Sequence, residues 1–173
     1  MGEYRLTPGK ETAYDTDVHV PLIVRGPGVP AGSTSPAMVS NIDLAPTFET
    51  LSRSGVDPMV DGVDLSPVWK GETPADWQPS VLIEHHHRQG VTLGPDRQNA
   101  RGADPPGYAA VRTPGALYVR YDTGEEEYYD TVADPNELDN LGRRGVPERM
   151  RRMLDALVHC HGTISCQAAA RPT

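Results

Sequence analysis

The chain has 173 residues, with 24 acidic and 16 basic side chains, and its formal net charge at pH 7 is -8. Such a chain is a poor candidate for binding nucleic acid or an anionic membrane surface, because both need a basic face. The sequence contains no apolar run near the roughly 18 residues of a membrane span and no signal peptide. Its apolar residues cluster at strand and helix periods, which predicts a folded chain rather than disorder.

The first predicted element is a buried strand over residues 18–24. Its residues are almost all Val, Leu or Ile, and a Gly-Pro-Gly sequence closes the run. Near-continuous apolar strands are typical of parallel sheets that helices cover on both faces. Lys10 follows Gly9 a short polar link upstream. The pattern therefore predicts one fixed cation near the end of this strand, where local positive charge can attract an anion to an acidic chain.

A helix is predicted next, over residues 41–54. Asp43 can cap it, Pro46 then falls in its first turn, and Gly55 supplies the stop. We expect its apolar side to pack inward. The residues on that side are Leu44, Phe48 and Leu51.

From residue 81 the sequence pattern changes to short β candidates. They cover residues 81–84, 108–113, 116–121 and 127–130, and turn residues separate the last three. A helix over residues 147–158 follows, with apolar residues at i, i+3, i+4, i+7 and i+8. The pattern predicts a small α+β subdomain, in which the helix covers an antiparallel meander of about four strands. The residues after this helix are read as a tail.

Four blocks of the sequence, in order, resemble the type I sulfatases of the alkaline-phosphatase-like superfamily. These blocks are residues 2–28, 41–47, 61–71 and 126–141, the last similar to the family's Asp-Pro-x-Glu-x-x-Asn-Leu element. The resemblance implies an α/β fold of which this chain is the C-terminal part. Residues 1–75 would end the large α/β domain, and residues 76–173 would form the small C-terminal subdomain. The missing N-terminal portion of the same fold would be its partner.

The resemblance also implies a chemistry, the hydrolysis of a sulfate ester to an alcohol or phenol and sulfate. Lys10 matches the family lysine that contacts the sulfate and the leaving oxygen. Tyr4 and His19 stand where the family has histidine and arginine, which leaves any role of these two positions open. The family's nucleophile is a formylglycine made from a cysteine, and its cofactor is calcium. Neither the cysteine motif nor the calcium-binding aspartate pairs occur here in the expected context, so we expect the chain to be inactive by itself. The parent's substrate would be a sulfated small molecule or glycan.

The sequence contains three further clusters of polar residues: histidines, carboxylates and arginines. His85 and His87 lie on one side of a predicted strand and are candidates for substrate contact, whereas a metal site lacks partners at ligand spacing. The carboxylates of residues 134–139 are interpreted as turn residues in water. The arginines of residues 149–152 are interpreted as the exposed face of the last helix.

Cys160 and Cys166 are the only cysteines, and they form either a small disulfide loop or two free thiols. A disulfide would favour an extracytoplasmic setting, and a secreted or periplasmic parent protein is expected. Two alternatives remain open. One is a fragment of another alkaline-phosphatase-like hydrolase, acting on phosphate or phosphonate esters, and the other is a non-catalytic binding module.

Overall fold

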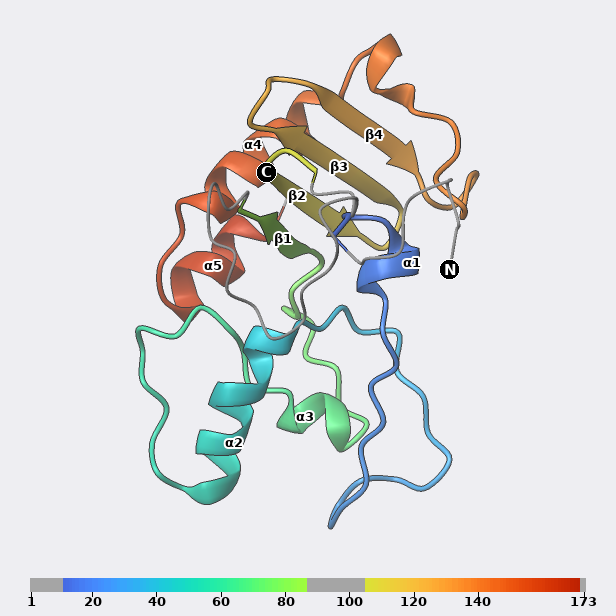
Figure 1. The fold of residues 1–173 in the computed structure, drawn as a ribbon. Coiled ribbons are helices and arrows are strands. Elements are labelled where there is room, and N and C mark those ends of the chain that lie inside the picture. Colours follow the sequence, from blue (N-terminus) through green and yellow to red (C-terminus); the bar gives the residue numbers. More distant parts are fainter. Residues whose placement is uncertain (1–10, 87–104, 172–173) are drawn as a thin grey trace, which may run out of the picture.

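The centre of the molecule is a four-stranded antiparallel meander (Figure 1). The computed structural model describes residues 11–86 and 105–171. The strands, which neighbour one another in chain order, are β1 (Val81–His85), β2 (Tyr108–Thr113), β3 (Ala116–Tyr121) and β4 (Glu126–Asp130). The predicted β2 and β3 are confirmed at both ends, and β1 and β4 are each one residue longer than predicted.

One face of the sheet is covered by α4 (Glu148–Val158), the helix predicted from the apolar period. Its buried side chains pack against Val111 and Tyr118 of the two central strands. Each large apolar side chain buried in this way contributes about 1.5–3 kcal/mol, so this layer is the main core of the chain. The buried residues of α4 are Met150, Met153, Leu154 and Leu157.

A further helix, α5 (Thr163–Ala169), follows α4, and the prediction of a tail there is wrong. The helix has only seven residues and no apolar stripe, so the sequence period gave no signal for it. A disulfide joins Cys160 to Cys166. Gly162, with φ of +79°, lies within this disulfide loop and precedes the first residue of α5.

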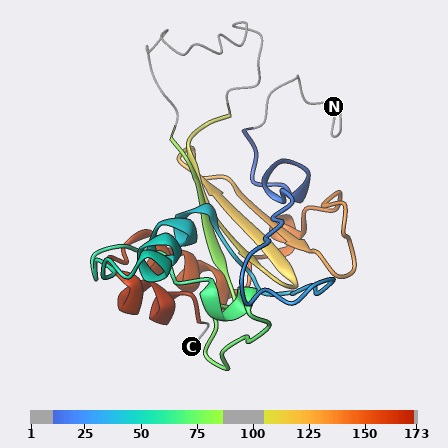
Figure 2. The ribbon, with the colours of Figure 1, turned by 90° about the horizontal axis from the view of Figure 1, so that it is seen from below.

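The opposite face of the sheet packs against the N-terminal part of the described chain. Ala13 lies in a second core with Leu117, Val119 and Tyr129. The short helix α1 (Asp15–Val18) follows it, and α1 and α4 lie on opposite faces of the sheet (Figures 1 and 2). The N-terminal segment and the C-terminal helix therefore enclose the sheet between them.

Below the sheet in Figure 1 lies the lower region, residues 19–79, which contains η2 (Asn41–Asp43), α2 (Leu44–Ser52) and α3 (Ser66–Trp69) joined by long irregular segments. The predicted helix over residues 41–54 is confirmed as far as Ser52, with a 3-10 turn as its first part. Asp43 was expected to cap it, but its side chain makes no cap hydrogen bond to α2. Arg53 and Gly55 both have positive φ, of 58° and 88°, which ends the helix.

The predicted strand over residues 18–24 is wrong for this structure. Val18 is the last residue of α1, and the residues after it have no regular structure. The side chain of Ile23 is 91% exposed and that of Val20 is 60% exposed. A strand needs neighbours to pair its backbone N–H and C=O groups, and no strand of the described residues lies beside this segment.

The apolar side of α2 is also exposed, against expectation. Phe48 is 57% exposed and Leu51 is 54% exposed, whereas Asp43, Pro46 and Thr47 are buried. The helix therefore faces the rest of the chain with its polar and small residues. None of the helices in the described part is long and apolar enough to cross a membrane.

Candidate functional site

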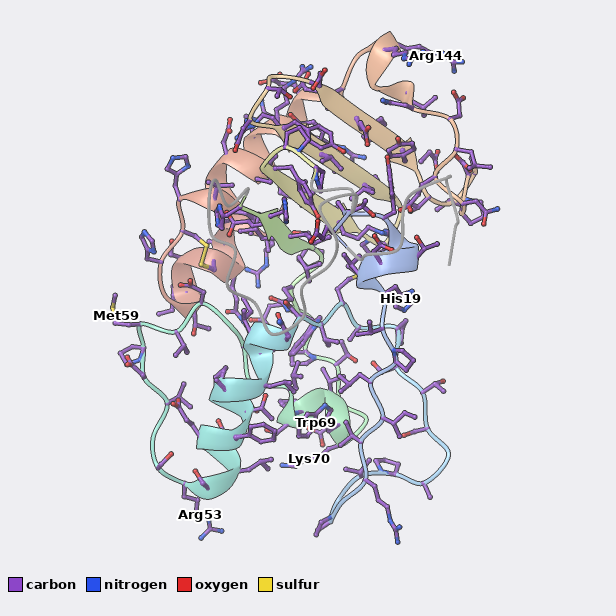
Figure 3. All side chains as sticks on the ribbon, in the orientation of Figure 1. His19, Arg53, Met59, Trp69, Lys70 and Arg144 are labelled. Atoms are coloured by element: carbon purple, nitrogen blue, oxygen red, sulfur yellow. A yellow bond between two sulfur atoms is a disulfide. The ribbon has the colours of Figure 1, made fainter. Side chains whose placement is uncertain are left out.

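The structure describes only some of the residues that the sequence suggests for a functional site. Lys10, Tyr4 and His87 lie outside the described residues. His85 ends β1, where its ring stacks on Tyr108 with 5.5 Å between ring centroids. His19 is exposed directly after α1, as Figure 3 shows.

Tyr108 connects the His85 end of the sheet to the segment that follows Lys10. Its hydroxyl donates a hydrogen bond of 3.1 Å to the backbone carbonyl oxygen of Glu11, the residue after Lys10. Burial, together with the charges of Asp17 and Glu11, raises the pKa of Tyr108 to about 12, so the phenol stays neutral and can donate. The backbone next to Lys10 is therefore held to the sheet by a contact between residues 97 positions apart.

A second contact holds the same segment from its own side. The backbone N–H and the hydroxyl of Thr12 both donate to the carboxylate of Asp17 in α1. Tyr108 and Asp17 were not singled out from the sequence, because their partners are set by the fold rather than by local spacing. An aromatic residue at the start of a predicted strand was the only signal available.

Arg112 fastens α1 to the sheet through a bidentate ion pair with Asp15. The guanidinium Nε and Nη2 lie 2.9 Å and 2.8 Å from the two carboxylate oxygens. This pair holds the pKa of Asp15 below its usual value. Two parallel charge-assisted hydrogen bonds give the contact a fixed orientation.

Glu137 belongs to the same group, and its interpretation as a solvated carboxylate is wrong. It is 3% exposed, and its Oε2 accepts a hydrogen bond of 2.9 Å from the backbone N–H of Asp15. Burial raises the pKa of Glu137 to about 6. Asp134 does act as a turn residue, since its carboxylate accepts from the backbone N–H groups of Leu138 and Asp139.

A tyrosine pair on the same face of the sheet shares one carboxylate. Glu127 Oε2 accepts from the hydroxyls of Tyr14 and Tyr129, at 3.0 Å and 3.2 Å. Burial raises the pKa of both phenols far above the usual value. These tyrosines therefore remain neutral and structural, and neither is a candidate nucleophile.

The described residues fit neither calcium nor a formylglycine. No group of three or more metal-binding side chains gathers among them. Both cysteines of the chain are bonded to each other, 2.01 Å apart at sulfur, so neither is free for conversion to formylglycine. The described residues instead supply a framework that positions the segment after Lys10.

Comparisons with known proteins place this framework among sulfatases. The family model described as N-sulphoglucosamine sulphohydrolase, C-terminal, matches residues 2–160. The chain is 33% identical over 186 aligned residues to the N-acetylglucosamine-6-sulfatase of Homo sapiens, covering 93% of this chain and 33% of the relative. It is 29% identical over 154 residues to the N-acetylglucosamine-6-O-sulfatase of Bacteroides thetaiotaomicron, covering 86% and 26%. The chain thus spans about a third or less of the length of these relatives.

Two solved structures resemble the fold. One was solved in complex with its substrate D-glucosamine-2-N,6-O-disulfate and matches with a TM-score of 0.60 and 25% identity, over 82% of this chain and 26% of that one. The other is the phosphonate monoester hydrolase from Silicibacter pomeroyi, with a TM-score of 0.68 and 27% identity, over 87% and 31%. Both matches again cover only part of the larger protein.

Proposed function

Because this chain belongs to the N-sulphoglucosamine sulphohydrolase C-terminal family, the C-terminal portion of type I sulfatases, we propose that it completes an enzyme that hydrolyses sulfate esters to an alcohol or phenol and sulfate. The family match over residues 2–160 carries this proposal. The segment 18–24, predicted as a strand, has no strand beside it among the described residues. We propose that the rest of the parent fold pairs with it.

In this proposal the chain contributes Lys10 and its support, and the rest of the protein contributes the nucleophile and the metal site. Lys10 would face the developing negative charge on the sulfate and the leaving oxygen, where a fixed cation is most effective. Tyr108 and Asp17 support this role by holding the residues directly after it. His85, at the end of β1, and His87, which lies outside the described residues, remain candidates for substrate contact.

The substrate that we propose is a sulfated glucosamine of a glycan. Two of the relatives are named as sulfatases of N-acetylglucosamine 6-sulfate, and one structural neighbour was solved with a disulfated glucosamine. We also propose a secreted or periplasmic location, since disulfides such as Cys160–Cys166 persist in oxidising compartments.

The test begins with the coding sequence upstream of Met1. The longer protein is expressed and assayed with N-acetylglucosamine 6-sulfate, next to chain 1–173 alone. We expect hydrolysis by the longer protein and none by the chain alone. We also expect Lys10→Ala to lower kcat by at least about tenfold, whereas Lys70→Ala, which removes an exposed lysine beside α3 (Figure 3), leaves kcat unchanged. A longer protein without a Cys-x-Pro/Ala-x-Arg motif and without sulfate hydrolysis contradicts the proposal.

A second candidate function is the hydrolysis of phosphonate or phosphate monoesters. The observation that favours it is the TM-score of 0.68 with a phosphonate monoester hydrolase. The same assay separates the two candidates, because the longer protein can be given a sulfate ester and a phosphonate ester of the same alcohol. A higher kcat/KM for the phosphonate ester favours this second function.

A further inference from the structure

A shallow hollow lies between α4 and α5. Three arginines border it, Arg149 and Arg152 from α4 and Arg171 after α5, and its volume is about 100 Å³. The floor is apolar and made of small or flexible side chains. These floor residues are Met153, Ala156, Ala168 and Ala169.

A second hollow of about 110 Å³ adjoins the first, because Arg149 and Met153 line both. It extends toward Pro79 and Thr113, near the ends of the first two strands. The two hollows together form a groove along α4. A groove with a cation between its two halves suits an elongated ligand better than a single small ion.

The charge of this groove is opposite to that of the chain. None of the described residues that line either hollow is acidic, although the chain has a net charge of -8. Arg171 is oriented by Asp76: its Nη2 donates a hydrogen bond to the backbone carbonyl and lies 3.9 Å from the exposed carboxylate. Further N–H donors remain on the guanidinium. Local positive charge of this kind selects anions against the field of the whole molecule.

We propose that this groove binds a sulfated oligosaccharide, with sulfate groups on Arg149, Arg152 and Arg171 and a sugar ring on the apolar floor. Guanidinium groups bind the oxygens of such anions through paired, charge-assisted hydrogen bonds. The choice of sulfate over other anions rests on the proposed function, which makes sulfated glycans the substrates of the parent enzyme. The arginines of residues 149–152 were interpreted from the sequence as an exposed helix face. The proposal gives Arg149 and Arg152 a role in binding.

The experiment measures binding of a heparin-derived tetrasaccharide to chain 1–173 by calorimetry at fixed salt. Arg149→Gln/Arg152→Gln is compared with the charge-matched Arg143→Gln/Arg144→Gln, whose arginines lie in η3 (Leu141–Arg144), where Figure 3 shows Arg144 far from α5. We expect the groove variant to lose at least about tenfold in affinity and the control variant less than about twofold. Melting curves verify that both variants are folded.

Three further results decide the proposal. Binding must disappear when the tetrasaccharide is desulfated, and inorganic sulfate must bind far more weakly than the tetrasaccharide. Equal losses of affinity in the two variants would mean that the tetrasaccharide is attracted only by general positive charge. This result would overturn the proposal. Binding by chain 1–173 but not by the longer protein would overturn it as well. None of these experiments measures hydrolysis. A failure of the groove proposal can therefore be distinguished from a failure of the proposed function.

Discussion

Apolar residues at a helical or strand period have opposite environments in two regions of the molecule, the sheet with α4 and the lower region. In α4 the periodic apolar residues are buried, with Leu154 fully enclosed. In the lower region they are exposed: eight of the eleven exposed large apolar side chains of the described residues lie between Val20 and Met59. The difference shows that an apolar period identifies the side of an element that is suited to burial. It does not identify the surface that buries that side.

The lower region is nevertheless held together internally by specific polar contacts. The carboxylate of Asp43 accepts hydrogen bonds from the backbone N–H groups of Ser40 and Val63, at 2.7 Å and 2.9 Å. The hydroxyl of Thr47 accepts from the backbone N–H of Leu65 at 2.8 Å. These buried hydrogen bonds fix α2 by its polar side. Its apolar side and residues 20–23 are exposed, and in the proposed sulfatase fold the rest of the protein would cover them.

A matched pair of leucine variants tests this contrast with the largest expected effect. Leu154→Ala removes a fully buried side chain and should lower the free energy of unfolding by about 2–5 kcal/mol. Leu51→Ala makes the same chemical change at a residue that is 54% exposed and should change it by less than about 0.5 kcal/mol. Urea denaturation followed by circular dichroism measures both. Similar losses for the two variants would contradict the contrast.

The disulfide Cys160–Cys166 closes a loop that contacts the lower region through hydrogen bonds, and its removal should have the next largest effect. The backbone N–H of Gly162 donates to Asp61 at 2.7 Å, and Thr163 donates to the carbonyl of Val60. Reduction of Cys160–Cys166 should lower the free energy of unfolding by about 2 kcal/mol. The measurement is urea denaturation with and without dithiothreitol. Dithiothreitol should have no effect on Cys160→Ala/Cys166→Ala, and an equal effect on this variant would refute the assignment.

The carboxyl of Glu137 should give the attachment of α1 a pH dependence. Its folded pKa, about 6, is higher than the ordinary value of 4.5, so the stability that it adds is present below about pH 4.5 and is lost as the pH rises through 6. Glu137→Gln does not titrate. We therefore expect the variant to gain about 1.5 kcal/mol relative to wild type between pH 4.5 and 7.5. Parallel stability curves for the two proteins over this range would exclude the effect.

The hydrogen bond from Tyr108 to Glu11 should contribute about 1 kcal/mol. Tyr108→Phe keeps the ring that stacks on His85 and removes only the hydroxyl. We expect faster amide exchange at Thr12, with β3 unchanged. Tyr129→Phe is the control, because its hydroxyl bonds to Glu127 instead. Equal exchange at Thr12 in both variants would show that Tyr108 does not hold this segment.

The smallest effect is expected at the exposed residues themselves. Ile23→Ser replaces a side chain that is 91% exposed and should leave the unfolding of chain 1–173 within about 0.5 kcal/mol. The same change in the longer protein should cost more, since Ile23 would there be covered. Urea denaturation of both proteins measures the difference, and equal costs would mean that the residue is not at an interface.

The sequence predicted the parts of the fold whose partners lie close along the chain. The meander strands and α4 carry their own turn residues and apolar period, so both were predicted correctly. The predictions of a strand over residues 18–24 and of an inward apolar side of α2 failed, because no surface of the described residues covers either of them. The helix α5 was not predicted, because seven residues are too few to show a helical period of apolar side chains.

The candidate site divides in the same way. Lys10 and His87 could be singled out by pattern alone, but they lie outside the described residues. Tyr108, Arg112 and Glu137 could not be assigned their roles from the sequence. Their partners are 97 to 122 residues away, and the burial of Glu137 is a property of the folded chain. Long-range polar contacts of this kind have no local sequence pattern.

Amide hydrogen exchange on chain 1–173 and on the longer protein tests the central claim most directly. If the chain is the C-terminal part of a sulfatase fold, the amides of β3 and α4 will be protected in both proteins. The amides of residues 20–24 will exchange freely in the chain and at least about tenfold more slowly in the longer protein, where a neighbouring strand pairs them. Equal exchange of residues 20–24 in the two proteins would contradict the account.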